Sequence, residues 1–282
     1  MYIIDLLQRL VKKQNIGIIV FLILNTFLVI ALFGDPITGI VLYTASLLIA
    51  LSPIGEWILR VQQGCKKLAR KEHIERLEPL FNEVYEKAKK LDPTIPDNVQ
   101  LFISNDSSPN AFATGRKTIC LTKGLLEYSD EEIKATLAHE FGHLSNKDTD
   151  LILLVTVGNM IVTAMFVLYR VIVSAIGIGV SIANRSFGSL IVTFLIDVVL
   201  VGLMWLWTKF GTVLVMNSVR KNEYEADKFA YDCGYGNELI VVLDKFNAMD
   251  TGATKGLWAN LSSTHPDPDQ RIGNLQKLDD VA

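Results

Sequence analysis

The sequence predicts a mainly α membrane protein, with four transmembrane helices in two hairpins and a small α+β domain outside the bilayer. Half of its 282 residues are hydrophobic and its mean hydropathy is +0.32, which is too apolar for an ordinary soluble domain. The apolar residues are gathered in two long blocks, residues 16–59 and 151–216. The polar segments between and after these blocks carry the patterns of amphipathic helices and short strands.

Residues 1–59 form the first predicted segment, an amphipathic lead-in followed by a transmembrane hairpin. Residues 16–33 are a nearly uninterrupted apolar run that is long enough to cross a bilayer. Gly34-Asp35-Pro36 predicts a turn, and residues 37–51 predict a second span that extends to about residue 59. The lead-in carries three basic residues that are expected near the membrane: Arg9, Lys12 and Lys13.

Basic residues flank this hairpin on one side only. None lies between its two spans, whereas the hairpin is followed by Arg60, Lys66, Lys67, Arg70 and Lys71. The positive-inside rule places such a side in the cytoplasm. We therefore expect an integral, multi-pass membrane protein with both termini in the cytoplasm.

The net charge bears on nucleic-acid binding, and the cysteines bear on the redox compartment. The formal net charge of −3 argues against a nucleic-acid-binding protein. Cys65, Cys120 and Cys233 are scattered and form no C-x-x-C motif. This usage indicates a reducing compartment and no disulfide framework.

Residues 60–150 are the first predicted cytoplasmic segment. Residues 57–91 have a mainly helical pattern, which Pro79 is expected to kink or to divide into two helices. Two strands and a loop between them are then expected, at residues 99–104, 117–122 and 107–115.

The helix after these strands carries the motif on which the functional prediction depends. Ser129 is its expected N-cap and forms a capping box with Glu132. Further along, His139-Glu140-Phe141-Gly142-His143 reads H-E-x-x-H, so the two imidazoles lie one above the other on one helix face. Two nitrogens at that spacing can hold one zinc ion, with Glu140 as the general base that takes a proton from water.

A catalytic zinc site needs a third protein ligand. The best candidate lies in residues 217–282, the last predicted segment, where Glu223 and Asp227 are four residues apart on one helix face. We expect Glu223 to bind the zinc and Asp227 to accept the N–H of a ligating histidine, which fixes the histidine tautomer. Glu225 points elsewhere on this helix and is predicted to be a surface or pairing carboxylate.

Residues 151–216 predict a second transmembrane hairpin, with a turn at residues 184–188. Two crossings return the chain to the side from which it left. This is necessary because His143, before the hairpin, and Glu223, after it, must lie on the same side of the membrane to bind one ion. Arg170 and Asp197 lie at similar depths in its two helices, so we expect them to pair or to line a polar cavity. An unpaired charge at the centre of a span costs about 2.5–3.5 kcal/mol. The alternative is that each side chain snorkels separately to an interface.

These motifs resemble those of a known family. The H-E-x-x-H helix, the stretch Glu223-Tyr224-Glu225-Ala226-Asp227, the string Asn110-Ala111-Phe112-Ala113-Thr114-Gly115 and the apolar hairpins are similar to HtpX-type integral-membrane zinc metalloproteases. The CAAX prenyl proteases are distant relatives of these enzymes. The resemblance covers residues 16 to 275 and implies a zincin-like cytoplasmic protease domain.

The resemblance also implies a function and its cofactor. We expect one Zn²⁺ per chain, held by His139, His143 and Glu223, in a gluzincin-type endopeptidase that cleaves peptide bonds at the cytoplasmic face. Its expected setting is membrane-protein quality control or the stress response in a bacterial plasma membrane. The expected partners are misfolded or membrane polypeptides, the lipid bilayer and other quality-control proteases.

Substrate binding is expected beside the zinc helix. Residues 110–115 followed by residues 117–122 predict an edge strand that pairs with an extended peptide through Asn110, Ala111, Phe112 and Ala113. The alternative is a plain turn and strand packed under the helix. The resemblance further implies that His265 stabilises the developing oxyanion and that Arg271 orients a carboxylate or the substrate backbone; an ordinary exposed histidine is the alternative for His265.

Two other functions are consistent with the same residues. One is a specialised processing protease that clips a peptide or a lipidated precursor. The other is a membrane scaffold with a structural zinc site, which predicts four protein ligands and no position for water. The presence of Glu140 in the motif argues against the scaffold.

Overall fold

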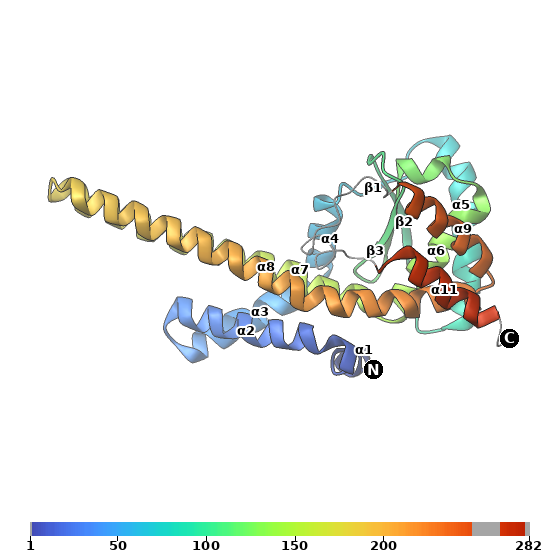
Figure 1. The fold of residues 1–282 in the computed structure, drawn as a ribbon, viewed down its shortest axis with the longest axis horizontal. Coiled ribbons are helices and arrows are strands. Elements are labelled where there is room, and N and C mark those ends of the chain that lie inside the picture. The colour runs from blue at the N-terminus through green and yellow to red at the C-terminus, as the bar shows by residue number, and fades with distance from the viewer. Residues whose placement is uncertain (1, 250–265, 280–282) are drawn as a thin grey trace.

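The computed structural model describes residues 2–249 and 266–279. Figure 1 shows a small sheet with helices at one end of the molecule and two helical hairpins that extend away from it. The longer hairpin consists of α7 (Asp148–Ala183) and α8 (Phe187–Asp232), and the shorter one of α2 (Ile16–Phe33) and α3 (Pro36–Ala50). The predicted combination of apolar helices and a small sheet is confirmed.

The first helix of the shorter hairpin, α2, has the bounds that the sequence predicts, residues 16–33. Helix α1 (Tyr2–Leu10) and the short helix η1 (Lys13–Asn15) precede α2. Gly34 ends α2 with a left-handed backbone (φ 69°), and its N–H donates to the carbonyl of Ile30. The Asp35 carboxylate then accepts the N–H of Thr38 and caps α3.

The second predicted span does not continue to about residue 59 as one straight helix. Helix α3 ends at Ala50, and α4 (Pro53–Gln62) follows it at an angle of 69°. Ser52 caps the new helix and Pro53 begins it, because proline lacks the N–H that a continuing helix requires. Gly55 permits this bend: a Cβ at Gly55 would lie 1.9 Å from the carbonyl oxygen of Ala50.

The helices of the longer hairpin continue into the folded domain without a break. Helix α7 has 36 residues and α8 has 46, and α8 continues through residue 216 to carry Glu223 and Asp227. The predicted pairing of Arg170 with Asp197 is confirmed: Nη2 of Arg170 lies 2.9 Å from Oδ2 of Asp197. Within the described residues, three helices are long and apolar enough to cross a membrane, and α3 with α4 is a fourth if the bent pair counts as one span. Four crossings therefore stay a prediction.

The sheet has four short strands in the order β1-β2-β4-β3. Strands β2 (Gln100–Ser104) and β4 (Thr118–Thr122) are parallel and were predicted within two residues. Strand β1 (Lys66–Lys67) pairs antiparallel with β2, and β3 (Ala111–Thr114) pairs antiparallel with β4. The prediction of a loop throughout residues 107–115 is wrong, because its second half forms β3. As predicted, this strand lies at an edge of the sheet.

Helices α5 (Lys71–Leu91) and α6 (Asp130–Ser145) pack with one face of this sheet in a single hydrophobic core. Pro79 lies inside α5, which continues past it. The short helix η2 (Lys123–Glu127) leads from β4 to α6, and α9 (Gly236–Met249) and α11 (Pro268–Asp279) complete the core. Strand residues Ile119 and Leu121 and helix residues Ile133, Leu137 and Phe141 are at most 1% exposed.

Candidate metal centre

Helix α6 begins as its sequence predicts. The Ser129 hydroxyl accepts the N–H of Glu132, and the Glu132 carboxylate accepts the N–H of Ser129 at 2.9 Å. This reciprocal capping box satisfies donors that a helix start leaves free. It fixes where α6 starts and so which residues of the H-E-x-x-H motif face α8.

The glycine of the motif lets α6 and α8 approach closely. A Cβ on Gly142 would lie 2.8 Å from Cα of Ala226. Any larger side chain at either position would therefore push the two helices apart. The approach brings Glu223, three residues before Ala226 on α8, to the face of α6 that carries both histidines.

His139, His143 and Glu223 converge in the structure. The Nε2 atoms of the two histidines are 3.2 Å apart, and the Glu223 oxygens lie 3.3 Å from Nε2 of His143 and 3.5 Å from Nε2 of His139. One ligand atom from each residue fits within a span of 4.8 Å. Among the described residues, this is the group of histidine, cysteine and acidic side chains with the geometry of a metal site.

The other ring nitrogen of each histidine lies beside a carboxylate. Nδ1 of His139 is 2.9 Å from Oδ1 of Asp227, and Nδ1 of His143 is 3.2 Å from Oδ2 of Asp148. A carboxylate that accepts the Nδ1–H leaves Nε2 with a free lone pair, which is the form of imidazole that binds metals. Asp227 was predicted at this place, whereas Asp148 was missed.

Arg271 of α11 orients the carboxylates on α8. Its Nε and Nη2 lie 2.8 and 2.5 Å from the two Asp227 oxygens, in a bidentate pair. Its Nη1 lies 3.1 Å from Oε2 of Glu223. The sequence left open whether Arg271 orients a carboxylate or the substrate backbone. In the structure it contacts two carboxylates.

Arg9 of the N-terminal helix was not predicted to lie near this site. Its Nε and Nη2 lie 3.0 and 2.5 Å from Oδ1 of Asp148, and its Nη1 lies 2.6 Å from Oε2 of Glu225. Arg9 is 4% exposed, so its side chain is buried in the protein; that it lies near the membrane stays a prediction. Glu225, expected at the surface or in a pair, is in a pair. No sequence pattern links positions 139 residues apart, so this contact required the fold.

The charges around the three converging side chains favour a divalent cation. Glu140, Asp148, Glu223 and Asp227 are buried, and the buried guanidinium groups beside them are those of Arg9 and Arg271. Four carboxylates and two guanidinium groups give this buried set of described residues a formal charge of −2 when both imidazoles are neutral. Buried charges are costly unless they are paired or coordinate a metal. Two imidazoles and one carboxylate are the donor set of a zinc site with an open position.

The pKa values of the two histidines report the same negative surroundings. Burial by itself lowers the pKa of His143, but the hydrogen bonds to Asp148 and Glu223 outweigh it and hold the pKa well above its ordinary value. Burial also lowers the pKa of His139, and hydrogen bonds to Asp227 and Glu223 outweigh it, so that this pKa is raised as well. Carboxylates that stabilise a proton on these rings will also stabilise a metal ion that replaces it.

Glu140 faces the edge strand. Its Oε2 accepts the N–H of Ala113 at 2.6 Å, so this N–H points away from β4. Ala111 and Ala113 pack on the core side of the sheet, beside α6. The structure therefore brings the predicted general base and part of the predicted substrate strand together.

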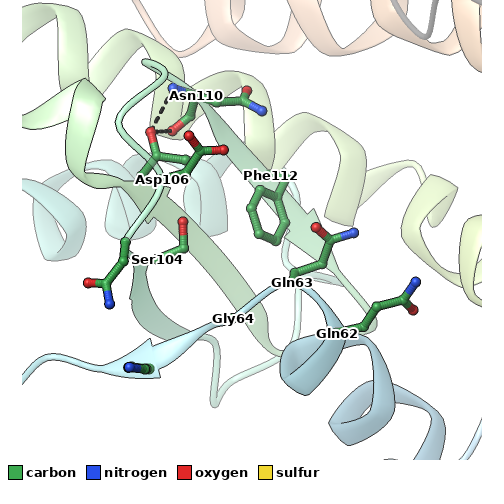
Figure 2. Close-up of a pocket in the computed structure, with 10 residues that line it drawn as sticks. Gln62, Gln63, Gly64, Ser104, Asp106, Asn110 and Phe112 are labelled. Atoms are coloured by element: carbon green, nitrogen blue, oxygen red, sulfur yellow. Dashed lines mark hydrogen bonds between the residues drawn. The ribbon is translucent and has the colours of Figure 1, made fainter.

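The side chains of Asn110 and Phe112 lie on the other side of the sheet. They line a cavity of about 420 Å³ together with Ser104, Asp106 and the end of α4. Figure 2 shows the Phe112 ring between β3 and Gln63 in this cavity. Because side chains alternate along a strand, the four predicted substrate-binding residues are divided between the two faces. His265 lies outside the described residues.

Comparisons with known proteins agree with the sequence resemblance. Residues 73–279 match the model of peptidase family M48. A protein named Protease HtpX homolog from Neisseria meningitidis is 28% identical over 216 residues, which cover 71% of this chain and 72% of that protein. Protease HtpX from Idiomarina loihiensis is 25% identical over 244 residues, which cover 79% of this chain and 80% of the relative.

A solved structure has a similar fold. The crystal structure of S. mikatae Ste24p aligns with a TM-score of 0.51 and 20% identity, over 97% of this chain and 65% of that chain. The present chain thus spans just under two thirds of the length of that protein, and the likeness at this identity concerns the fold. With the family match, these findings confirm the resemblance to HtpX-type membrane metalloproteases.

Proposed function

This chain belongs to peptidase family M48, and we propose that it is a zinc-dependent endopeptidase of the membrane with its active site at the cytoplasmic face. One observation carries the proposal. Two imidazoles of one helix and a carboxylate of a second converge within 4.8 Å, and Glu140 lies next to them, beside an edge strand. This arrangement supplies metal ligands, a proton acceptor and a place for an extended peptide.

His139, His143 and Glu223 would hold the metal. Their nitrogen and oxygen donors suit zinc, which leaves one coordination position for water or substrate in catalytic sites of this kind. When bound, zinc acidifies water and polarises a substrate carbonyl. Asp148 and Asp227 orient the two imidazoles, and Arg9 and Arg271 hold these carboxylates in turn.

Glu140 is the proposed general base. It takes a proton from the attacking water and delivers that proton to the leaving amine. Its carboxylate accepts the N–H of Ala113 at 2.6 Å, which places the acid–base group next to the edge where the substrate backbone would lie. Proximity of this kind is what the hydrolytic step requires.

We propose that β3 binds the substrate by strand addition. Strand β3 is an edge strand whose Ala113 N–H points away from β4 and is donated to Glu140. An extended peptide pairs with an edge of this kind through main-chain hydrogen bonds, and Glu140 would give up this N–H to the peptide. These contacts are largely independent of sequence. The proposal therefore fits an enzyme that degrades many misfolded or membrane polypeptides, as in quality control or the stress response.

The test is a comparison of metal content and cleavage. Full-length protein purified in detergent and loaded with zinc is assayed for zinc per chain and for casein cleavage. We expect Glu140→Gln to retain zinc and to lose activity by about 10²–10⁴-fold, the contribution of a general base. Glu131→Gln, at an exposed acid of the same helix, is the matched control and is expected to behave as the wild type.

Three outcomes contradict the proposal. Glu140→Gln that cleaves at the wild-type rate excludes Glu140 as the base. Wild-type protein that binds no zinc after loading excludes zinc as the metal of this site. Zinc-loaded wild type that cleaves no polypeptide supports the scaffold with a structural zinc site.

A further inference from the structure

Helix α4 has one face packed on the protein and one face that no described residue covers. Its buried positions include Gly55, Glu56 and Leu59. On the opposite face Ile54, Trp57 and Val61 are 58%, 57% and 60% exposed. Positions i, i+3 and i+7 form one stripe along a helix, so α4 presents a continuous apolar stripe with a tryptophan at its centre.

The stripe lies at the level where the helical hairpins leave the folded domain. Leu59 packs with Ala50, Leu153 and Val157. Helix α7 is largely buried from its start to Gly158 and exposes large apolar side chains from Met160 onward. Helix α4 therefore contacts α7 just before the lipid-exposed part of that helix begins.

The direction of α4 is fixed by its start. Figure 1 shows α4 running across the direction of the α7–α8 hairpin, whereas α2 and α3 run along it. The bend of 69° from α3 is held by the Ser52 cap, by Pro53 and by the contact of Gly55 with the Ala50 carbonyl. If α7 and α8 cross the bilayer, α4 lies in the plane of its surface.

The residues that follow α4 carry positive charge. Lys66, Lys67, Arg70 and Lys71 are exposed, and basic side chains close to an anionic membrane surface are attracted to it. Tryptophan is enriched at the headgroup level, where its ring has apolar and polar surroundings. We propose that α4 is a surface-bound helix whose partner is the headgroup region of an anionic lipid bilayer.

This contact would set the height of the substrate strand above the lipid. The Glu56 carboxylate accepts the hydroxyl of Thr118 at 2.6 Å and the N–H of Lys117 at 3.3 Å, so it holds the turn between β3 and β4. Gly115 in this turn has φ 59°, and a Cβ there would lie 2.5 Å from Cγ of Glu56. The turn is thus seated directly on α4.

The assignment leaves α3 alone as the return crossing of the first hairpin. Its 15 residues are about 22 Å long at 1.5 Å per residue, shorter than a hydrocarbon core of about 30 Å. Short spans are accommodated by local thinning of the bilayer and by snorkelling of the flanking side chains. The shorter hairpin in Figure 1 agrees with this view, since α7 and α8 extend well beyond it.

The depth of Trp57 tests the proposal without any measurement of activity. Full-length protein is placed in vesicles of phosphatidylcholine and phosphatidylglycerol whose chains are brominated near the headgroup or near the chain end, and aqueous iodide is used as a third quencher. The quenching of Trp57 itself is obtained by subtracting the fluorescence of the Trp57→Phe protein from that of the wild type, with and without each quencher. The matched control is Trp205→Phe, because Trp205 is exposed on α8 nearer the tip of the hairpin.

We expect shallow bromine to quench Trp57 more than deep bromine does, and iodide to quench it weakly. For Trp205 the ratio of deep to shallow quenching should be higher. Replacing phosphatidylglycerol by phosphatidylcholine should weaken the quenching of Trp57 by shallow bromine, and quenching that stays unchanged would exclude a contribution of anionic headgroups. Stronger quenching of Trp57 by deep bromine would place α4 inside a span, strong quenching by iodide would place it in water, and protection from all three would mean a protein partner. Each of these results overturns the proposal.

Discussion

Arg9 and Asp148, 139 positions apart in the chain, form a buried ion pair behind the candidate metal centre. The guanidinium Nη2 lies 2.5 Å from Oδ1 of Asp148, and Oδ2 of the same carboxylate lies 3.2 Å from Nδ1 of His143. The N-terminal helix, which precedes all predicted spans, is therefore linked to a proposed zinc ligand through one carboxylate.

Loss of Arg9 should destabilise the whole protein. Arg9→Met leaves Asp148, which is 2% exposed, as a buried charge without its guanidinium partner, and a broken buried pair costs about 3–5 kcal/mol. The free energy of unfolding in detergent measures this loss. Lys12→Met, at an exposed position of the same segment, should change it by less than about 0.5 kcal/mol. If both substitutions lowered the free energy of unfolding equally, Arg9 would contribute through the net charge of the segment and not through its pair with Asp148.

Loss of the Asp227 carboxylate should weaken metal binding. Asp227→Asn removes the charge that orients His139 through Nδ1 and pairs with Arg271. Partners of this kind contribute about 10–100-fold to metal affinity, which competition with a chelator measures. Asp232→Asn, at the pair with Lys228 one turn further along α8, should leave the affinity unchanged. An Asp227→Asn protein that binds zinc as tightly as the wild type would remove Asp227 from the proposed site.

The edge strand can be tested through its backbone. Ala113→Pro removes the N–H that points to Glu140 and to the open edge, and proline is tolerated on edge strands. A main-chain hydrogen bond contributes about 0.5–1.5 kcal/mol, so kcat/KM for an extended peptide should fall by up to about tenfold. The melting temperature should stay within a few degrees. Ala113→Ser keeps the N–H and is the control. A loss that appears in KM indicates lost pairing with the peptide, a loss only in kcat indicates displacement of Glu140, and equal kcat/KM for the two variants would count against any role of this N–H.

The pair of Arg170 and Asp197 should contribute to the stability of the longer hairpin. Either Arg170→Met or Asp197→Leu leaves one charge alone within the apolar part of the hairpin, at a cost of up to about 2.5–3.5 kcal/mol. The double substitution Arg170→Asp with Asp197→Arg restores opposite charges at the same depth. It should recover most of the lost unfolding free energy in detergent or in bilayers. A double variant no more stable than the single ones would show that the contact at 2.9 Å contributes little.

The sequence was sufficient where the controlling interactions are local. The capping box of Ser129 and Glu132 and the four-residue spacing of the two histidines depend on neighbours within one helix. The first span was also predicted with its observed bounds, because Gly34 ends it and a long apolar run has few alternatives.

One local feature was missed although a signal was present, and a second was predicted ambiguously. Ser52-Pro53 is a helix N-cap followed by proline at the first helical position, which indicates a new helix rather than a continuing span. The strand at Ala111–Thr114 is only four residues long, and the sequence predicted both a loop and an edge strand there, because so short an alternation does not distinguish the two.

The remaining contacts depend on the tertiary fold. Arg9 resembles the other basic residues of the N-terminal lead-in, and nothing near it in the chain indicates burial. Its place against Asp148 and Glu225 follows only when α1 packs where α7 starts and α8 ends. Likewise, Gly142 reads as a variable position of the motif until Ala226 is seen to lie against it.

His139, His143 and Glu223 form the proposed zinc site. Zinc K-edge absorption of the zinc-loaded, full-length protein tests it most directly. The predicted first shell contains two imidazole nitrogens and oxygen donors at about 2.0–2.2 Å and no sulfur, and Glu223→Gln should weaken or abolish the bound zinc. A shell that contains sulfur at about 2.3 Å, or one unchanged in the Glu223→Gln protein, would contradict this ligand set.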